Sequence, residues 1–308
     1  MELYNDYNSY LKKRHGSKVY RIALDAGFSC PNRNSTSDSS GCIYCNEDGS
    51  RASYTEQLLP VREQMKNRME YLKSSKKASK FIAYFQAFTN THSSVEKLKI
   101  LYDEALAFSG VVGLSIGTRP DCIDREKANL ISSYKEQYET WIEYGLQSSH
   151  DRTLQFLNRG HKFEDFLKAL ELTKQYGINI SCHVILGLPG ETREDIIETA
   201  KRLSCLGIDG IKIHLLHILK GSRMEEMYNR GEINVLEQDY YVSLVCDFLE
   251  HLSHKILIQR LTGEGAKEKH IAPLWALDKL NTINKIKKEM TKRGSWQGKA
   301  VGKEKIIF

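Results

Sequence analysis

Hydrophobic and polar positions along this 308-residue chain repeat in one order: a short apolar, β-branched run is followed by a longer amphipathic segment. Strand candidates lie at 19–25, 80–86, 111–118, 140–147, 178–186 and 209–216. From the second onward they recur roughly every thirty to forty residues, the length of one βα unit. Helix candidates lie at 56–72, 95–108, 163–176 and 193–206, the last with Thr192 as its capping residue. Alternating units of this kind predict a parallel sheet, open or closed into a barrel.

Four strand candidates carry polar or small side chains on one side and apolar side chains on the other. Glu143 and Gln147 share the polar side of their strand. The same side of the other three holds Gly113, Ser115 and Gly117, then Asn179, Ser181 and His183, then Lys212 and His214. A parallel sheet covered by helices on both faces would be apolar on both sides. The pattern therefore favours a barrel whose polar side lines a ligand-filled lumen, with separately hydrogen-bonded buried groups as the alternative.

The repeating order ends after residue 216. A helix at 239–254, a short strand at 256–261 and a basic helix at 277–293 are predicted there. The fold class that follows is α/β, a barrel with a C-terminal α/β extension. We divide the chain into a barrel over 1–218, with a cysteine loop at 25–49, and an extension over 219–308 packed on the barrel.

The cysteine loop, directly after the first strand, is the clearest chemical signal in the sequence. Cys30, Cys42 and Cys45 are spaced C-x11-C-x2-C. The closely spaced pair can place two thiolates on one metal centre, and the polar insertion can fold Cys30 back to them. A structural zinc site or a closed [4Fe–4S] cluster takes four protein ligands, and no fourth cysteine or histidine stands nearby in the sequence. Three ligands leave one position open for a small molecule.

Composition places the chain among ordinary globular proteins, with 41% hydrophobic and 27% charged residues. Its longest apolar runs fall well short of the ~18 residues that a membrane span needs. The N-terminus has no basic and apolar leader, so a cytoplasmic protein is expected. In a reducing compartment the four remaining cysteines, Cys122, Cys182, Cys205 and Cys246, are expected to be small buried hydrophobes.

Positive charge is concentrated near the C-terminus. Residues 279–305 contain nine Lys or Arg and two Glu, a local charge of +7, whereas the whole chain carries +6. The rest of the chain is therefore close to neutral. A basic segment on a neutral body predicts contact with a polyanion, nucleic acid first among them, and a solvated helix face is the alternative.

The cysteine triad belongs to an ordered set of motifs between residues 14 and 299. The set is RHGSKVYRIALDAGFSCPNR, GCIYCN, YFQAFTNTH, IGTRPDC, YGLQSSHDRTL, NRGH, HVILGLPGET, RLTGEGAKEKHIAPLW and RGSWQGK. It resembles the radical S-adenosylmethionine (SAM) superfamily, and more closely its YtqA/YhcC-type bacterial branch, which is related to the Elongator catalytic subunit. The resemblance implies a partial (β/α)6 TIM-like barrel and a [4Fe–4S] cluster held by Cys30, Cys42 and Cys45. It also implies that SAM binds the fourth iron and is cleaved reductively to a 5′-deoxyadenosyl radical.

The resemblance further implies a set of SAM contacts. They are Tyr44, Gln86, Glu143, Gln147, Arg159, Gly187 and Gly190. Gln86 stands where the superfamily often has a Gly-Gly-Glu stretch, which this chain lacks. The alternatives are loop packing for Tyr44, a surface salt bridge for Arg159 and an ordinary turn for the glycines. His183 and His214 are either substrate or SAM contacts or satisfied core residues.

The resulting hypothesis is an enzyme that modifies the carbon-5 side chain of the tRNA wobble uridine, with carboxymethylaminomethyl- to aminomethyl-uridine as one such step. The implied partners are tRNA and a reductant protein such as flavodoxin or ferredoxin, with no membrane contact. No catalytic residue and no oligomeric state is assigned. Two alternatives stay open: a radical SAM enzyme acting on a small metabolite or cofactor precursor, and a zinc-stabilised, non-catalytic RNA-binding protein.

Overall fold

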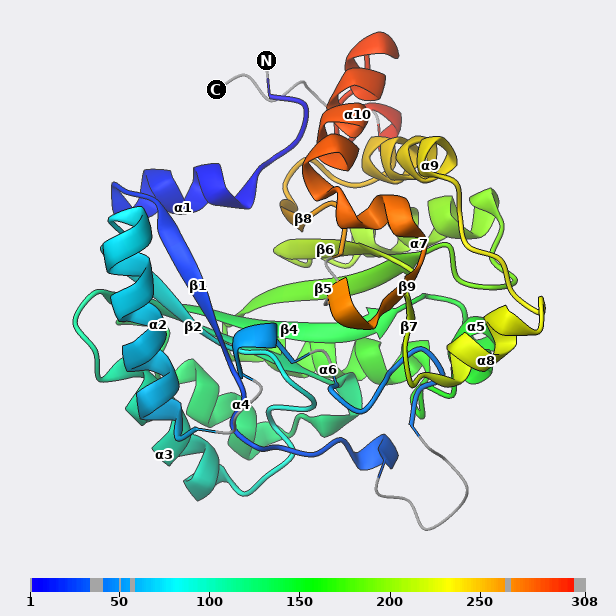
Figure 1. The fold of residues 1–308 in the computed structure, drawn as a ribbon. Helices are drawn as coiled ribbons and strands as arrows, with labels where there is room; N and C mark the ends of the chain where they lie inside the picture. Colours follow the sequence, from blue (N-terminus) through cyan, green and yellow to red (C-terminus); the bar gives the residue numbers. More distant parts are fainter. Residues whose placement is uncertain (1, 34–40, 50, 56–58, 264–266, 302–308) are drawn as a thin grey trace.

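Seven parallel strands form one curled sheet in the computed structural model, which describes residues 2–33, 41–49, 51–55, 59–263 and 267–301 (Figure 1). The strands are β1 (Val19–Leu24), β2 (Lys80–Phe85), β3 (Val111–Thr118), β4 (Glu139–Gln147), β5 (Asn179–Leu186), β6 (Gly210–Leu215) and β8 (Leu257–Arg260). Their order in the sheet, β1-β2-β3-β4-β5-β6-β8, follows the chain without a reversal. Such an order winds the sheet in one direction, as in a barrel, rather than into an open doubly wound sheet. The predicted partial barrel is confirmed.

Helices cover the outer face of the sheet. Successive strands are connected through α2 (Val61–Lys76), α3 (Val95–Leu106), α4 (Arg125–Ser132), α5 (Asp151–Phe156), α6 (Phe163–Gln175) and α7 (Arg193–Cys205), and β8 follows α8 (Arg223–Asn229) and α9 (Gln238–Glu250). A two-stranded antiparallel ribbon pairs β7 (Ile218–Leu219) with β9 (His270–Ala272). The Thr192 hydroxyl accepts from the backbone N–H of Asp195, so the predicted cap of α7 is confirmed. Residues 56–58 of the predicted second helix lie outside the described residues.

The alternating pattern of the strands gives the sheet its two different faces. Ile142, Tyr144, Cys182 and Ile211 point toward the helices and are fully buried in one apolar core. The prediction that the apolar side faces the helices is therefore confirmed. One cysteine departs from expectation: Cys205 is exposed, because it ends α7.

The N-terminal segment bridges the gap between the two edge strands of the curled sheet. The backbone N–H of Ile258 in β8 donates to the carbonyl of Asn5 at 2.7 Å. Helix α1 (Tyr7–His15) follows and contacts both β1 and β8. Its Tyr7 ring meets Trp141 edge to face, with 5.3 Å between the ring centroids. Tyr7, Leu11, Trp141 and Leu257 share one apolar cluster, here called the barrel plug.

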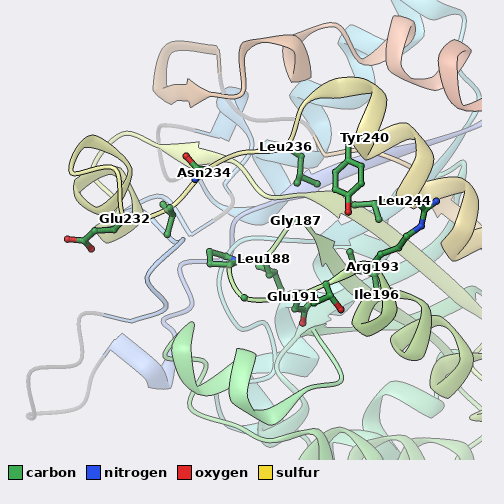
Figure 2. A pocket seen from close by; sticks show the side chains of 14 residues that line it. Gly187, Leu188, Glu191, Arg193, Ile196, Glu232, Asn234, Leu236, Tyr240 and Leu244 are labelled. Carbon is green, nitrogen blue, oxygen red and sulfur yellow. The ribbon is translucent and has the colours of Figure 1, made fainter.

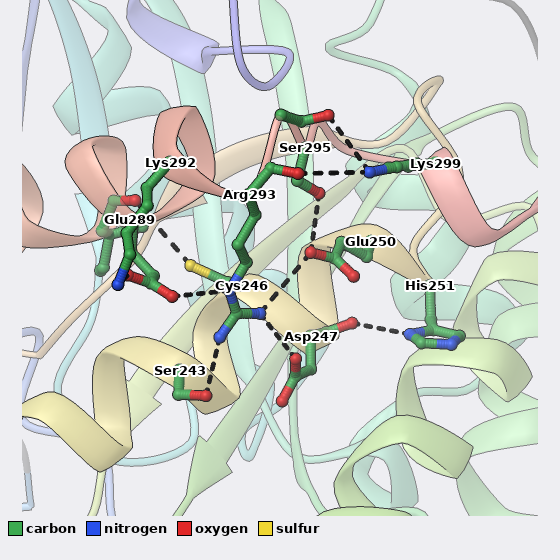
Figure 3. Close-up of polar contacts among 12 residues, drawn as sticks. Ser243, Cys246, Asp247, Glu250, His251, Glu289, Lys292, Arg293, Ser295 and Lys299 are labelled. Atoms are coloured by element: carbon green, nitrogen blue, oxygen red, sulfur yellow. Dashed lines mark hydrogen bonds and ion pairs between the residues drawn. The ribbon is translucent and has the colours of Figure 1, made fainter.

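Helix α10 (Lys279–Lys292) packs beside α9 and runs in the same direction. Gln238 at the start of α9 contacts Thr282. Asp247 near the end of α9 pairs with Arg293, as Figure 3 shows. Ile286 is fully buried between the two helices. Strand β8 belongs to the predicted extension yet completes the barrel sheet, and the proposed boundary at 218/219 falls inside β7. None of the described helices is long and apolar enough to span a bilayer.

Replacing Trp141 with alanine should lower the free energy of unfolding by about 3–5 kcal/mol, because the truncation leaves a cavity in the barrel plug. Urea unfolding curves measure the change. Tyr71→Ala is the control, since that side chain is 53% exposed, and it should shift stability by less than about 1 kcal/mol. A Trp141→Ala protein as stable as the control would contradict a supporting role for the plug.

Candidate functional site

The cysteine loop is anchored to the turn that follows α5. Asn158 donates from its side chain to the carbonyl of Gly41 at 2.9 Å, and Asn32 donates to the carbonyl of Asn158 at 2.6 Å. A Cβ atom at Gly160 would stand 2.4 Å from the Asn32 side-chain oxygen. Only glycine allows the two segments to approach this closely, and Gly160 also has a left-handed φ of 69°. The NRGH motif therefore positions the loop that carries the cysteines.

The thiols of the predicted triad lie in two short turns of this loop. Cys42 and Cys45 share one turn, closed by a backbone hydrogen bond of 3.0 Å. Cys30 precedes the 3-10 turn Pro31–Arg33, whose Arg33 donates to the Cys45 sulfur at 3.0 Å. Among the described residues, no three His, Cys, Asp or Glu side chains are gathered as a metal site. The three cysteines thus lie in two turns of one loop, without being gathered around one metal position.

A buried guanidinium lies directly beside Cys42. Arg159 donates to the Cys42 sulfur at 3.2 Å and to the carbonyl of Gly145, in β4, at 2.5 Å. Arg119, just after β3, donates to the carbonyl of Arg159 at 2.7 Å. Arg159 is 6% exposed, so the alternative of a surface salt bridge is wrong. The arginine instead connects the cysteine loop to the end of β4.

The electrostatics of this corner favour a thiolate at Cys42. Burial alone would raise the pKa of the Cys42 thiol, but Arg159 and Arg119 outweigh burial and the pKa is lowered. Thiolate is the form that binds metals. Three thiols on one loop with cations beside them therefore fit an iron–sulfur cluster by the chemistry of their donor set. Burial raises the pKa of Tyr44 well above its usual value, and its hydroxyl contacts Cys42.

The predicted SAM contacts Gln86 and Gln147 lie at the carboxyl ends of β2 and β4, two strands that β3 separates. Gln86 follows β2, and its backbone N–H donates to the carbonyl of Leu24 at 3.2 Å. Gln147 ends β4 at a left-handed φ of 77°, where the register between β4 and β5 shifts. Both residues are half-buried. They therefore lie at the carboxyl-terminal end of the parallel strands, where the cysteine loop also begins, directly after β1.

Gly187 and Gly190 line a pocket of about 310 Å³ beside the end of β5 (Figure 2). Its other walls come from the start of α7, the start of α9 and residues 232–236. A Cβ atom at Gly187 would stand 2.8 Å from Leu236, so glycine lets that segment close the pocket. Glu191 in the same wall accepts from Ser148, and burial raises the pKa of Glu191. The glycine motif thus forms a hollow on the helix side of the sheet edge.

Inside the barrel, the polar sides of four strands meet at one carboxylate. Glu143 accepts hydrogen bonds from Lys212, from Ser115 at 2.6 Å and from His183 at 2.9 Å. Lys212 also reaches the Tyr84 hydroxyl at 2.9 Å. Glu143 and Lys212 are each 1% exposed. The sequence-based prediction of a polar lumen is confirmed, and the separately bonded alternative is not, because these groups form one network.

This network fixes the protonation of its members. Burial raises the pKa of Glu143, but Lys212 and His183 outweigh it and hold the pKa well below its usual range. Burial and the neighbouring Lys212 lower the pKa of His183 to about 4. The lumen therefore contains a buried ion pair beside an imidazole that is neutral at neutral pH.

Several residues of the site were not assigned from sequence. Three of them contact Cys42, Cys45 or Arg159: Asn32, Arg33 and Arg119. Each belongs to one of the sequence motifs given above, but the motifs did not assign a role to it. Lys212 was recognised on the polar side of its strand, but its pairing with Glu143 was not. That pairing depends on which residues of β4, β5 and β6 lie at the same height.

Comparison with known proteins agrees with the fold. The family model for the Radical SAM superfamily matches residues 30–203, and that for the Radical_SAM C-terminal domain matches residues 208–292. Protein MJ0486 of Methanocaldococcus jannaschii is 44% identical over 300 residues, covering 96% of this chain and 92% of its own length. YtqA of Bacillus subtilis is 42% identical over 299 residues, with the same coverage.

Two further matches bear on the kind of relative. A tRNA uridine(34) acetyltransferase of M. jannaschii is 30% identical over 138 residues, 44% of this chain and 25% of that protein. The structure of Methanocaldococcus infernus Elp3 with an N-terminal deletion superposes with a TM-score of 0.70 at 19% identity, covering 91% of this chain and 64% of that one. The latter likeness concerns the fold alone.

The chain belongs to the radical SAM superfamily, as its near full-length relatives and the family match over 30–203 establish. Members of this family bind a [4Fe–4S] cluster and SAM. Within the family, the chain is of the YtqA and YhcC kind, since YhcC of Escherichia coli is 35% identical over 98% of it.

Replacing Lys212 with methionine should lower the free energy of unfolding by about 3–5 kcal/mol, because it leaves the Glu143 carboxylate buried without its cation. Adding Glu143→Gln to Lys212→Met should restore a substantial part of the loss. Chemical denaturation of the cofactor-free protein measures both. Lys168→Met is the control, since Lys168 forms an exposed pair with Glu164 and should change stability by less than about 1 kcal/mol. Equal effects of Lys212→Met and Lys168→Met would contradict the importance of the lumen pair.

Proposed function

We propose that this radical SAM protein acts in the cytoplasm on the carbon-5 side chain of the tRNA wobble uridine, converting a carboxymethylaminomethyl group to aminomethyl. The match to a tRNA uridine(34) acetyltransferase across 44% of the chain carries this proposal. The Elp3-like fold and the basic helix α10 support it.

In this proposal Cys30, Cys42 and Cys45 hold the cluster. The SAM contacts are Tyr44, Gln86, Glu143, Gln147, Arg159, Gly187 and Gly190. When bound, the cluster and SAM supply one-electron chemistry that ends in hydrogen-atom abstraction from the substrate. Arg159 contributes a buried positive charge beside Cys42, suited to the carboxylate of SAM.

The chain's own part is to provide an enclosed, preorganised chamber. The barrel plug closes one end of the lumen, at Tyr7 and Trp141. The Glu143–Lys212 pair presents fixed charges along the wall. Exclusion of water protects reactive intermediates and strengthens electrostatic contacts. A reductant protein such as flavodoxin or ferredoxin would deliver the electron at the cysteine loop.

Two sets of exposed cations could contact tRNA phosphates. On α10, Lys285 and Arg293 are already paired with acidic residues of α9, while Lys287 and Lys288 are exposed. Lys220 and Arg223 are exposed beside the cysteine loop, where Asn46 contacts the carbonyl of Lys220 at 3.4 Å. The second set adjoins the cysteine loop, whereas α10 packs on α9.

Protein purified and reconstituted without oxygen should contain about four irons with matching sulfide, and should release 5′-deoxyadenosine with dithionite and SAM. Cys30→Ala, Cys42→Ala and Cys45→Ala should each lose the cluster and this release. Cys205→Ala should keep both, because Cys205 is exposed at the end of α7. Stoichiometric zinc with no SAM cleavage would instead favour the non-catalytic RNA-binding alternative.

The substrate is tested with tRNA that carries 5-carboxymethylaminomethyluridine at the wobble position. Incubation with the active protein, SAM and reductant should yield 5-aminomethyluridine, detected by mass spectrometry of the digested nucleosides. SAM cleavage that tRNA neither accelerates nor couples to a new nucleoside would favour the small-metabolite alternative.

Binding to tRNA should weaken steeply with added salt, because phosphate contacts release counterions. Lys287→Gln with Lys288→Gln should lower the salt slope by up to about two. Removing everything after Asp278 is a poorer test, since it strips α10 from α9. Filter binding across a salt series measures the slope, with Lys220→Gln and Arg223→Gln as the comparison pair. An unchanged slope in the α10 variant would place the tRNA contact away from that helix.

A further inference from the structure

The β6 and β8 side of the lumen holds buried polar groups that lack partners within the described residues. The Nε2 atoms of His214 and His217 are buried with no hydrogen bond, and so is the Ser181 hydroxyl. The rings of His183 and His214 lie 5.3 Å apart, centroid to centroid. A Cβ atom at Gly263 would stand 2.7 Å from His217 Nε2 and 3.3 Å from His214 Nδ1. Buried polar atoms left unpaired are costly, so these point to a ligand.

The charge of this region is positive. Arg260 lies beside Lys212 in the register between β8 and β6. Lys212 and Arg21 both face the single carboxylate of Glu143, Arg21 at 3.8 Å. The Arg260 backbone pairs with β6, but its side chain forms no hydrogen bond or ion pair with another described residue. Lys212 and the two arginines thus share one carboxylate on the described walls, and an anion would balance the charge of the arginines.

The same surroundings disfavour a metal cation as the missing group. Among the residues that the structure describes, no cluster of ligating side chains is arranged to hold one. Burial and Arg260 lower the pKa of His214, and burial and the neighbouring His270 lower that of His217 to about 4. His217 Nδ1 lies 3.3 Å from His270 Nδ1, and His270 Nε2 donates to the Pro273 carbonyl, so the one proton of a neutral His217 faces His270. A neutral His214 can donate a hydrogen bond from Nε2 to an anion, and Arg260 can supply the charge.

We propose that Arg260, with His214, binds the carboxylate of the substrate inside the barrel, beside His217. Two sources of a carboxylate are available, SAM and the substrate. Arg159 already stands beside Cys42 and the cysteine loop, whereas Arg260 is on the strand at the opposite edge of the sheet from β1. The Arg260 site is therefore assigned to the substrate. This rests on the proposed function in one respect: the wobble substituent to be trimmed ends in a carboxylate.

The test uses reconstituted wild-type protein, Arg260→Gln, the charge-preserving Arg260→Lys and the control Arg230→Gln, whose arginine forms an exposed pair with Glu232. Equilibrium titrations with 5-carboxymethylaminomethyluridine, 5-aminomethyluridine and SAM measure three affinities for each. The wild type should prefer the carboxylate nucleoside, and Arg260→Gln should reduce that preference roughly tenfold or more. Arg260→Lys should retain part of it, while Arg230→Gln and all SAM affinities stay at wild-type values.

Acetate, a carboxylate without a nucleoside, separates failure of this site from failure of the proposed function. It should shift the His214 and His217 ring NMR signals in the wild type and not in Arg260→Gln. Acetate binding without nucleoside preference would uphold the carboxylate site and remove the wobble-uridine substrate. Conversion of tRNA with no acetate effect and an unchanged preference in Arg260→Gln would overturn the site alone. Loss of SAM affinity in Arg260→Gln, with the preference intact, would assign the site to SAM and overturn the proposal.

Discussion

The ion pair between Glu143 and Lys212 is the constraint on which the interior of this barrel depends. An isolated charge in a buried lumen is strongly unfavourable, so each member requires the other and the hydrogen bonds around them. Ser115, His183 and Tyr84 complete that environment. Because these groups come from five different strands, the pair sets the relative heights of β2 to β6. The polar groups of the interior thus favour one arrangement of the strands over others.

A second electrostatic arrangement serves the cysteine loop. Arg159 reaches from the turn after α5 to Cys42 and to the last part of β4. Its carbonyl is in turn held by Arg119 from the end of β3, and Arg119 is anchored by Asp121 at 2.8 Å. The loop that carries the thiols is thus fastened to two central strands by charged side chains. A redox centre at this position would interact electrostatically with the positive charges of Arg119 and Arg159.

Sequence reasoning recovered the sheet well because the strands obey a period of two and the helices between them are long. The predicted strand at 111–118 and the observed β3 coincide, and the remaining strands differ by a residue or two. Short elements with little apolar content were missed, among them α1, whose buried residues are Tyr7 and Leu11. The position of α1 depends on the gap between β1 and β8, and this gap exists only after the sheet has curled.

The site was recoverable as residue types but not as contacts. Spacing identified the cysteines, and alternation placed Glu143 and Lys212 on the lumen side. The partnership of those two joins residues 69 apart and follows from the register through β5, which no local pattern encodes. The burial of Arg159 likewise depends on the loop crossing back to it. The sequence pattern therefore specifies which residue types belong to the site, whereas the tertiary structure decides which of them are in contact.

The seam between β1 and β8 has a consequence for how the molecule is assembled. Asn5 joins Ile258 in β8, and the carbonyl of Leu3 accepts from Gln297 at 2.9 Å, so the first and last described segments meet at one end of the barrel. During synthesis the earliest residues must wait for nearly the whole chain before this seam can form. The outer edge of β1 therefore stays unpaired until β8 has been made and the seam has formed.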